Sequence, residues 1–247
     1  MRKDMGVGYS TVSPSGLSGT MASTFATIDG SLERWIRRQP MFFVASAPLD
    51  PHGHVNVSPK GPIGTFAVID PTTVAYLDFF GSGAETMAHL RENGRIVVML
   101  CAFQGPPQII RLHGRGSIVW PSDAKFDELS ARCAFSGLTD LQEAQRGIVL
   151  VEVDRISKSC GYGVPLMDVV GERNHFDLSK RKRLRTMGSE QLAEFQATRN
   201  ATSIDGLPAV DADRVRSAAA RGSSYAERMA HGSPRAPGSG IVELESQ

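Results

Sequence analysis

The sequence predicts a mainly β protein, an antiparallel barrel of six or seven strands, closed or partly closed, with peripheral helices. Short apolar runs rich in β-branched and aromatic residues recur along the chain, separated by turn-forming Asp, Pro and Gly. Single short helical patterns interrupt these runs. The alternating βαβ units of a parallel sheet are therefore not expected.

The amino-terminal part of the barrel is expected to carry one helix and two β-hairpins. Apolar residues stand at helical spacing behind Ser31, a residue type that caps helices, and Pro40 ends the pattern. Four short strand-like runs follow, and turn formers that include Asp and Pro join each pair. The predicted elements are a helix over 31–39 and strands over 41–47, 54–59, 65–69 and 73–80.

Two longer strands are expected in the middle of the chain. Residues 95–103 form a nearly continuous apolar run, as in a strand buried on both faces. Residues 108–120 contain Gly114 and Gly116, which predict a bulge or a sharp barrel corner. The remaining predicted elements are a helix over 84–93, a helix over 121–135, a last strong strand over 147–157 and a polar helical segment over 176–200.

Composition limits the class of protein. The chain has 247 residues, 41% of them apolar and 21% charged, and its formal net charge of +1 provides no general attraction for nucleic acid or anionic membranes. The cysteines, Cys101, Cys133 and Cys160, show no CxxC spacing, so neither a disulfide framework nor a structural zinc site is expected. No apolar run is long enough to cross a bilayer. The cytoplasm is the expected compartment.

Three regions are expected along the chain. The Gly- and Ser-rich residues 1–24 predict a disordered arm, with an organellar targeting peptide as the alternative. Residues 25–208 would hold the barrel and its carboxy-terminal helices. Beyond Pro208 the composition shifts to Ala, Arg, Ser, Gly and Pro, so a disordered tail is expected over 209–247.

Four motifs stand out by their order and spacing. They are VNVSPKG (55–61), VAYLDFFGSGAETMAHLREN (74–93), GPPQIIRLHGRG (105–116) and SCGYGVPLM (159–167). Together they resemble the pyridoxamine 5′-phosphate oxidase-like superfamily, and the last resembles a branch of small members found in bacteria and fungi. The resemblance implies an FMN-binding split β-barrel that pairs as a homodimer and holds the flavin between its subunits.

The resemblance also implies a set of cofactor-binding residues. A lysine that approaches the flavin corresponds to Lys60, and Ser58 shares its face of the predicted strand. The backbone of the next strand end would meet the flavin ring, and the phosphate would bind in the loop before the helix, where glycines and a helix N-terminus favour anions. The positions carried over are Ser58, Lys60, Leu77, Asp78, Gly81, Ser82, Gly83 and Thr86.

The chain departs from the resemblance in the phosphate loop. The oxidases proper carry a basic pair there, whereas Ala84 and Glu85 stand near this position. A carboxylate repels a phosphate, so another cation is needed. Arg111 is the expected source, from across the barrel or from the partner subunit.

The function expected from the resemblance is an FMN-dependent oxidoreductase acting on an unidentified small organic substrate. A deazaflavin is a variant, and a heme-binding or cofactor-free barrel without activity is the alternative. No residue is specific enough to be assigned as catalytic. No metal site is expected, because His54 and His89 have no cysteine or carboxylate at ligand spacing. The basic run 180–185 predicts a solvated helix face, with a nucleic-acid patch as the alternative.

Overall fold

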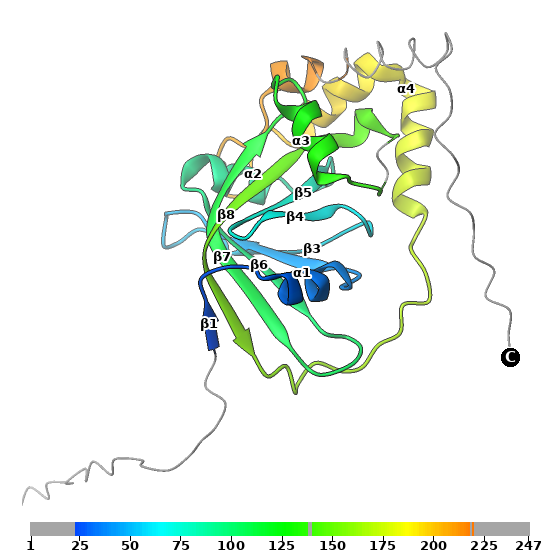
Figure 1. Ribbon diagram of the computed structural model, residues 1–247. Helices are drawn as coiled ribbons and strands as arrows, with labels where there is room; N and C mark the ends of the chain where they lie inside the picture. Colours follow the sequence, from blue (N-terminus) through cyan, green and yellow to red (C-terminus); the bar gives the residue numbers. More distant parts are fainter. Residues whose placement is uncertain (1–22, 138–139, 218, 220–247) are drawn as a thin grey trace, which may run out of the picture.

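The protein is described by a computed structural model over residues 23–137, 140–217 and 219 (Figure 1). Its strands form one sheet with hydrogen-bonded neighbours in the order β3-β2-β6-β7-β8-β5-β4, and β1 pairs with β8. The strands are β1 (Ser23–Phe25), β2 (Phe42–Ser46), β3 (Asn56–Lys60), β4 (Phe66–Asp70), β5 (Thr73–Phe79), β6 (Arg95–Cys101), β7 (Ile109–Val119) and β8 (Gln145–Ser159). All pairings are antiparallel, which confirms the predicted class.

The described sheet has eight strands rather than six or seven. The additional strand, β1, is three residues long and begins inside the expected arm, where its residues are exposed and carry no apolar alternation. Residues 1–22 of that arm lie outside the described residues.

The barrel is split along a seam between β3 and β4, the two ends of the hydrogen-bonded path. The chain crosses this seam through residues 61–65. The long strands β7 and β8 bend around the core, and their register shifts between His113 and Gly114, which confirms the predicted bulge. A Cβ on Gly114 would lie 2.0 Å from the carbonyl oxygen of Glu152, so the close approach of the two strands requires glycine there.

Apolar side chains fill the barrel, and a second cluster lies outside β5 and β8, beneath α3 (Phe126–Cys133) and α4 (His175–Arg199). Val44, Tyr76 and Leu112 are among the fully buried residues inside. The expectation that residues 95–103 are buried on both faces is wrong. Burial alternates along β6, because one face points into the barrel while Val97 and Met99 on the other are only half-buried.

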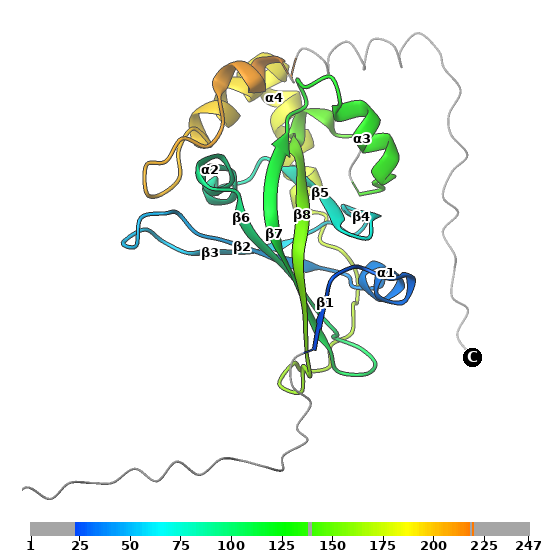
Figure 2. The ribbon, with the colours of Figure 1, turned by 60° about the vertical axis from the view of Figure 1, so that its left-hand side comes forward.

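Figure 2 shows α1 (Gly30–Arg37) beside β4, while α3 and α4 gather at the far end of the long strands. On the other side of the long strands in this view, α2 (Glu85–Glu92) packs on β2, β6 and β7. The cap of α1 is Asp29 rather than the expected Ser31, since the Asp29 carboxylate accepts a 2.7 Å hydrogen bond from the Leu32 N–H. A short 3-10 helix (Gln142–Ala144) precedes β8, and α4 is kinked at Gly188.

Ordered structure continues past Pro208, so the expected start of a disordered tail at residue 209 is wrong. Ala209, Val210 and Val215 are buried in the main core, and the Arg91 guanidinium donates to the Ala209 carbonyl. The composition of this segment does not reveal that it is ordered, because it is largely polar. Three small or medium apolar side chains are nevertheless enough to pack it against the core. Residues 218 and 220–247 of the expected tail lie outside the described residues. None of the helices described combines the length and apolar character needed to cross a membrane.

Candidate functional site

A cleft of about 760 Å³ lies at the seam of the barrel. Its polar lining includes Lys60 and Asp78, from the ends of β3 and β5, and Leu77 lies beside them. The surrounding walls are largely apolar and come from five different parts of the chain. They include Met41, Phe43, Ile63, Phe79, Phe103, Met167, Val169, Val170 and Phe176. The cleft therefore combines an apolar slot with the opposite charges of Lys60 and Asp78, and Asp168, Glu172 and Arg173 add further charges to its lining.

Two of these charges, on Lys60 and Asp78, belong to a network centred on the buried Asp78 carboxylate. This carboxylate is 3% exposed and accepts hydrogen bonds from the Lys60 ammonium at 2.9 Å and the Arg146 guanidinium at 2.7 Å. Burial alone would raise the pKa of Asp78, but the two cations outweigh it and hold this pKa below its usual range. The Asp78 carboxylate thus holds the Lys60 ammonium at the edge of the cleft in one orientation.

A row of polar side chains runs from this network along β3. Asn56, Ser58 and Lys60 share one face of the strand, opposite the outward-facing Val57 and Pro59. The Ser58 hydroxyl donates to Asn56 at 3.1 Å, and the Asn56 amide donates to the hydroxyl of Thr86 in the first turn of α2 at 3.0 Å. The row therefore connects the cleft with the helix N-terminus.

The loop before α2 is exposed at Gly81 and Ser82, and its backbone carbonyls are held from behind. Lys180 donates to the Phe80 carbonyl, Asn200 to Gly81 at 3.3 Å, and Arg146 to Gly83 at 2.7 Å. A Cβ on Gly81 would meet no atom within 4 Å, so the fold itself does not require glycine there. The open space at Gly81 is what a phosphate-binding loop needs.

The structure brings most of the expected site residues together. Ser58, Lys60, Leu77, Asp78 and Thr86 lie along the row and its cleft, and the Gly81–Gly83 loop adjoins Thr86. Arg111 does not join them within one subunit. It lies in register with Met99 and hydrogen-bonds the Ser159 hydroxyl at 3.0 Å. Its contribution from a partner subunit remains a prediction.

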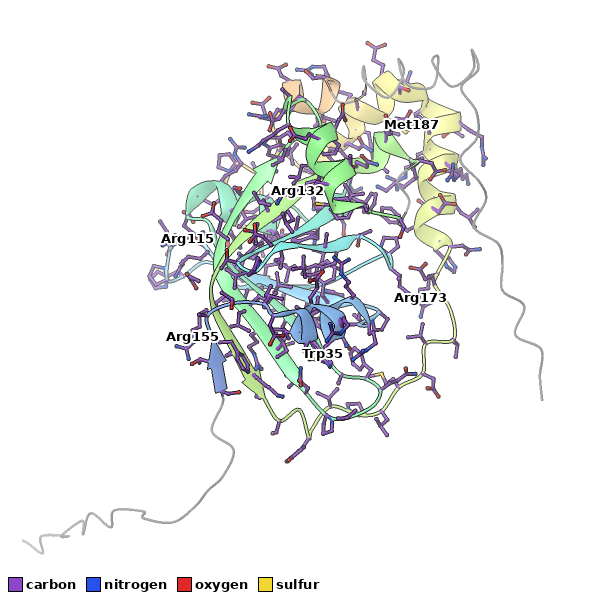
Figure 3. The ribbon with its side chains drawn as sticks, viewed as in Figure 1. Trp35, Arg115, Arg132, Arg155, Arg173 and Met187 are labelled. Carbon is purple, nitrogen blue, oxygen red and sulfur yellow. The ribbon has the colours of Figure 1, made fainter. Side chains whose placement is uncertain are left out.

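A strap formed by residues 161–173 closes one side of the cleft. The Met167 N–H donates to the Phe103 carbonyl at 2.9 Å, and the Glu172 carboxylate accepts from the Ile63 N–H at 2.6 Å. Figure 3 shows Arg173 where this strap runs into the lower end of α4. Of the SCGYGVPLM motif, Met167 lines the cleft, and Tyr162 is 78% exposed.

Several groups in the site were not found in the sequence analysis, namely Asn56, Arg146, Lys180 and Asn200. Arg146, Lys180 and Asn200 are more than 60 residues away in sequence from the loop that they contact, so the spacing of residues does not reveal them. Asn56 lies two residues before Ser58, and the two-residue period of a strand would have placed it on the same face.

The donor set fits a flavin better than a heme or a metal ion. The described lining of the cleft contains no histidine that would ligate heme iron. No group of three His, Cys, Asp or Glu residues placed to hold a metal occurs in the part of the chain that the structure describes. Hydroxyls, an amide, an ammonium and an apolar slot suit a phosphorylated planar ring.

The fold and site together define an antiparallel split barrel with a cleft and a row of polar side chains at its seam. Residues 28–160 match the family model described as pyridoxamine 5′-phosphate oxidase. The chain is 38% identical over 194 residues to the pyridoxamine 5′-phosphate oxidase family protein ustO of Aspergillus flavus, covering 74% of this chain and 76% of that protein. The chain therefore belongs to the pyridoxamine 5′-phosphate oxidase family.

Solved structures with this topology are more distant. The HupZ protein of Group A Streptococcus is 18% identical with a TM-score of 0.40, over 52% of this chain and 91% of that one. A FAD-binding protein of Mesorhizobium loti is 15% identical with a TM-score of 0.39, over 56% and 97%. These similarities are too low to transfer a ligand or an activity.

Proposed function

We propose that this chain is an FMN-dependent oxidoreductase that acts on a small organic substrate, with FMN held between the subunits of a homodimer. The observation that carries the proposal is the polar row on β3. From Asn56 to Lys60 it spans about 13 Å at roughly 3.3 Å per residue. One end meets the loop before α2 and the other meets the apolar cleft, so an elongated ligand with an anionic end and a planar end fits the row.

Each part of the row has a distinct role in this proposal. The Gly81–Gly83 loop and Thr86 bind the phosphate, while Ser58 and Asn56 face the polyol chain of the ligand. Leu77 and Asp78 border the ring, and Lys60 places a fixed positive charge beside it, which favours an electron-rich form of a bound ring. FMN, when bound, supplies the transfer of hydride or electrons.

The walls of the cleft indicate the class of substrate. Phe103, Met167, Val169 and Phe176 present apolar surface around the space next to Lys60 and Asp78. Such a lining favours a small apolar or aromatic molecule over a sugar or a polyanion.

We also expect the protein to act in the cytoplasm, as its unpaired cysteines suggest.

We propose that a second copy of the chain covers the outer face of β3. Val57 on this face is 61% exposed and Val55, just before the strand, is 71% exposed, and the half-buried Phe43 and Met99 continue the face across β2 and β6. Pairing of two copies would remove this apolar surface from water. Light scattering coupled to size-exclusion chromatography checks the pairing, and a strictly monomeric protein would contradict it.

Titration of the purified full chain with FMN, riboflavin and heme tests the cofactor. We expect FMN to bind with the visible absorption of a protein-bound flavin, and Lys60→Met and Ser82→Ala to weaken it. Lys158→Met removes an exposed lysine from β8 and serves as the control. Absence of FMN binding by the wild-type protein, or wild-type affinity in both site variants, would refute the assignment.

A further inference from the structure

The basic run 180–185 contains one lysine that does not face solvent. Lys180 is partly buried against the ring of Phe176, with 5.0 Å between its ammonium and the ring centroid, and it donates to the carbonyl of Phe80. Its neighbour Arg181 instead pairs with Asp140 and Asp177. Within the described residues Lys180 has no carboxylate partner, so its charge is unbalanced.

Lys180 is one of three side chains that reach the loop from the same side. Arg146 and Asn200 contact each other, with 2.6 Å between the guanidinium and the amide oxygen. Burial lowers the pKa of Lys180, and the nearby positive charges of Arg183 and Arg146 lower it further. The three donors hold three carbonyls of the loop, those of Phe80, Gly81 and Gly83.

Peptide geometry determines what the other side of the loop presents. In a trans peptide the C=O and the N–H point in opposite directions. With the carbonyls of Phe80, Gly81 and Gly83 turned toward the three donors, the N–H groups of the following residues, Gly81, Ser82 and Ala84, turn away from them. Among the described residues none of these N–H groups has a hydrogen-bond acceptor, so they are free to bind an anion.

The charge around the loop also favours an anion. Lys60, Arg146 and Lys180 are cationic, whereas Asp78 is the carboxylate that neutralises part of this charge. A cation bound to a peptide carbonyl also polarises that peptide and makes its N–H a stronger donor. Glu85 opposes the effect, since its carboxylate lies 2.6 Å from where a Gly83 Cβ would stand.

We propose that Lys180, together with Arg146 and Asn200, positions the Gly81–Ala84 backbone as a phosphate-binding nest and supplies positive charge from behind it. Lys180 acts through the peptide group and does not contact the ligand. This inference rests on the proposed function, because the phosphate is that of the bound FMN. The long helix α4 is thereby part of the cofactor site although it lies outside the barrel.

The test compares FMN with riboflavin, which lacks the phosphate. In Lys180→Met we expect FMN affinity to fall about tenfold, equivalent to about 1.4 kcal/mol, with riboflavin affinity unchanged. Lys180→Arg should retain most of the preference for FMN. Lys182→Met removes an exposed charge from the same helix and should change neither affinity. Thermal unfolding of each variant identifies any general loss of folding.

The pH dependence gives a second readout. Burial, with Arg183 on α4 and Arg146 on β8 as the facing cations, lowers the pKa of Lys180 to about 8. The wild-type preference for FMN over riboflavin should therefore weaken as the pH rises through about 8, and Lys180→Arg should remove that decline. The same approach applied to Asn200→Ala tests the nest without removing a charge, and FMN affinity should again fall more than riboflavin affinity.

The outcomes separate the two proposals. If the wild-type protein binds FMN no more tightly than riboflavin, the loop is not a phosphate site and the proposed cofactor assignment fails with it. If the wild-type protein prefers FMN and folded Lys180→Met retains that preference at every pH, Lys180 has no positioning role. The assignment of FMN would survive that second result.

Discussion

Two irregular segments border the site, and they are held in opposite ways. The loop Gly81–Gly83 is short, and buried or partly buried side chains from β8 and the α4 region bind its carbonyls and that of Phe80. The strap 161–173 is long, and backbone groups and surface carboxylates fasten it at a few points. Between those points it exposes apolar residues, including Val170, which is fully exposed.

This difference separates two tasks within one site. A loop whose carbonyls are fixed presents its N–H groups with little freedom, so it suits recognition of one invariant group such as a phosphate. A strap with few anchors opens locally at low free-energy cost. Under the proposed function, we therefore expect ligand specificity in the cleft to depend on the strap and cofactor retention to depend on the loop.

The largest effect is expected from the base of the loop. Asp78→Ala leaves Arg146 as a buried cation and Lys60 as a partly buried cation without their carboxylate partner, and breaking such a network costs about 3–5 kcal/mol of folding free energy. Asp154→Ala removes an exposed carboxylate from β8 and should cost little. Chemical denaturation measures both. A small loss in Asp78→Ala would show that the network does not anchor the loop.

The same network predicts an acid limit to stability. Because the pKa of Asp78 is held below its ordinary value of 3.8, its ion pairs stabilise the fold above that value. This contribution should disappear as the pH falls below about 3.8 toward the lower native pKa. Denaturation of the wild-type protein and Asp78→Ala across this range should show the two stabilities converging.

A smaller effect is expected where the strap begins. Gly161 has a φ of +68°, and a Cβ there would lie 2.8 Å from the Gln108 backbone nitrogen. Gly161→Ala should therefore destabilise the fold by roughly 1–3 kcal/mol. Gly163 has no atom within 4 Å of a built Cβ, so Gly163→Ala should stay within about 0.5 kcal/mol of wild type. Equal effects of both changes would mean that Gly161 is not a fixed anchor.

The comparison also shows which parts of the molecule the sequence was able to predict. The hairpins were recognisable because β2, β3, β4 and β5 are local elements with turn formers between them. The loop was placed correctly before α2 for the same reason. The side chains that bind its carbonyls were not, because Arg146 and Asn200 reach it through tertiary packing, which no local pattern encodes.

The error at the carboxy-terminal end has the same origin. A low apolar content predicts disorder when the segment is considered alone. Val210 and Val215 instead use a surface that the barrel and α4 have already formed. Likewise, Lys180 within a run of six basic or apolar residues resembled a solvated face, because periodicity does not identify the one side chain that turns inward.

The negative charge of Glu85 lies beside Gly83 of the loop, where it would oppose the binding of an anion. Glu85→Gln should strengthen FMN binding about fivefold, or about 1 kcal/mol, which is the interaction energy of two unit charges about 4 Å apart in water. It should also cost a few tenths of a kcal/mol in stability, because Glu85 lies in the first turn of α2. Glu128→Gln makes the matching change in the first turn of α3 and should cost stability without altering binding. Unchanged FMN affinity in Glu85→Gln would place the phosphate elsewhere.

A small effect on folding is expected at Gly81. A substitution there tests whether the open space beside this residue is needed by the fold or by a ligand. Nothing in the fold lies within 4 Å of a built Cβ there, unlike at Gly161. Gly81→Ala should therefore leave the free energy of unfolding within about 0.5 kcal/mol of wild type. It should weaken FMN binding more than riboflavin binding. Because the added methyl meets no protein atom, selective loss of FMN affinity would identify the phosphate as the group that needs this space. A variant that binds both flavins as the wild type does would show that the open space at Gly81 has no part in cofactor binding.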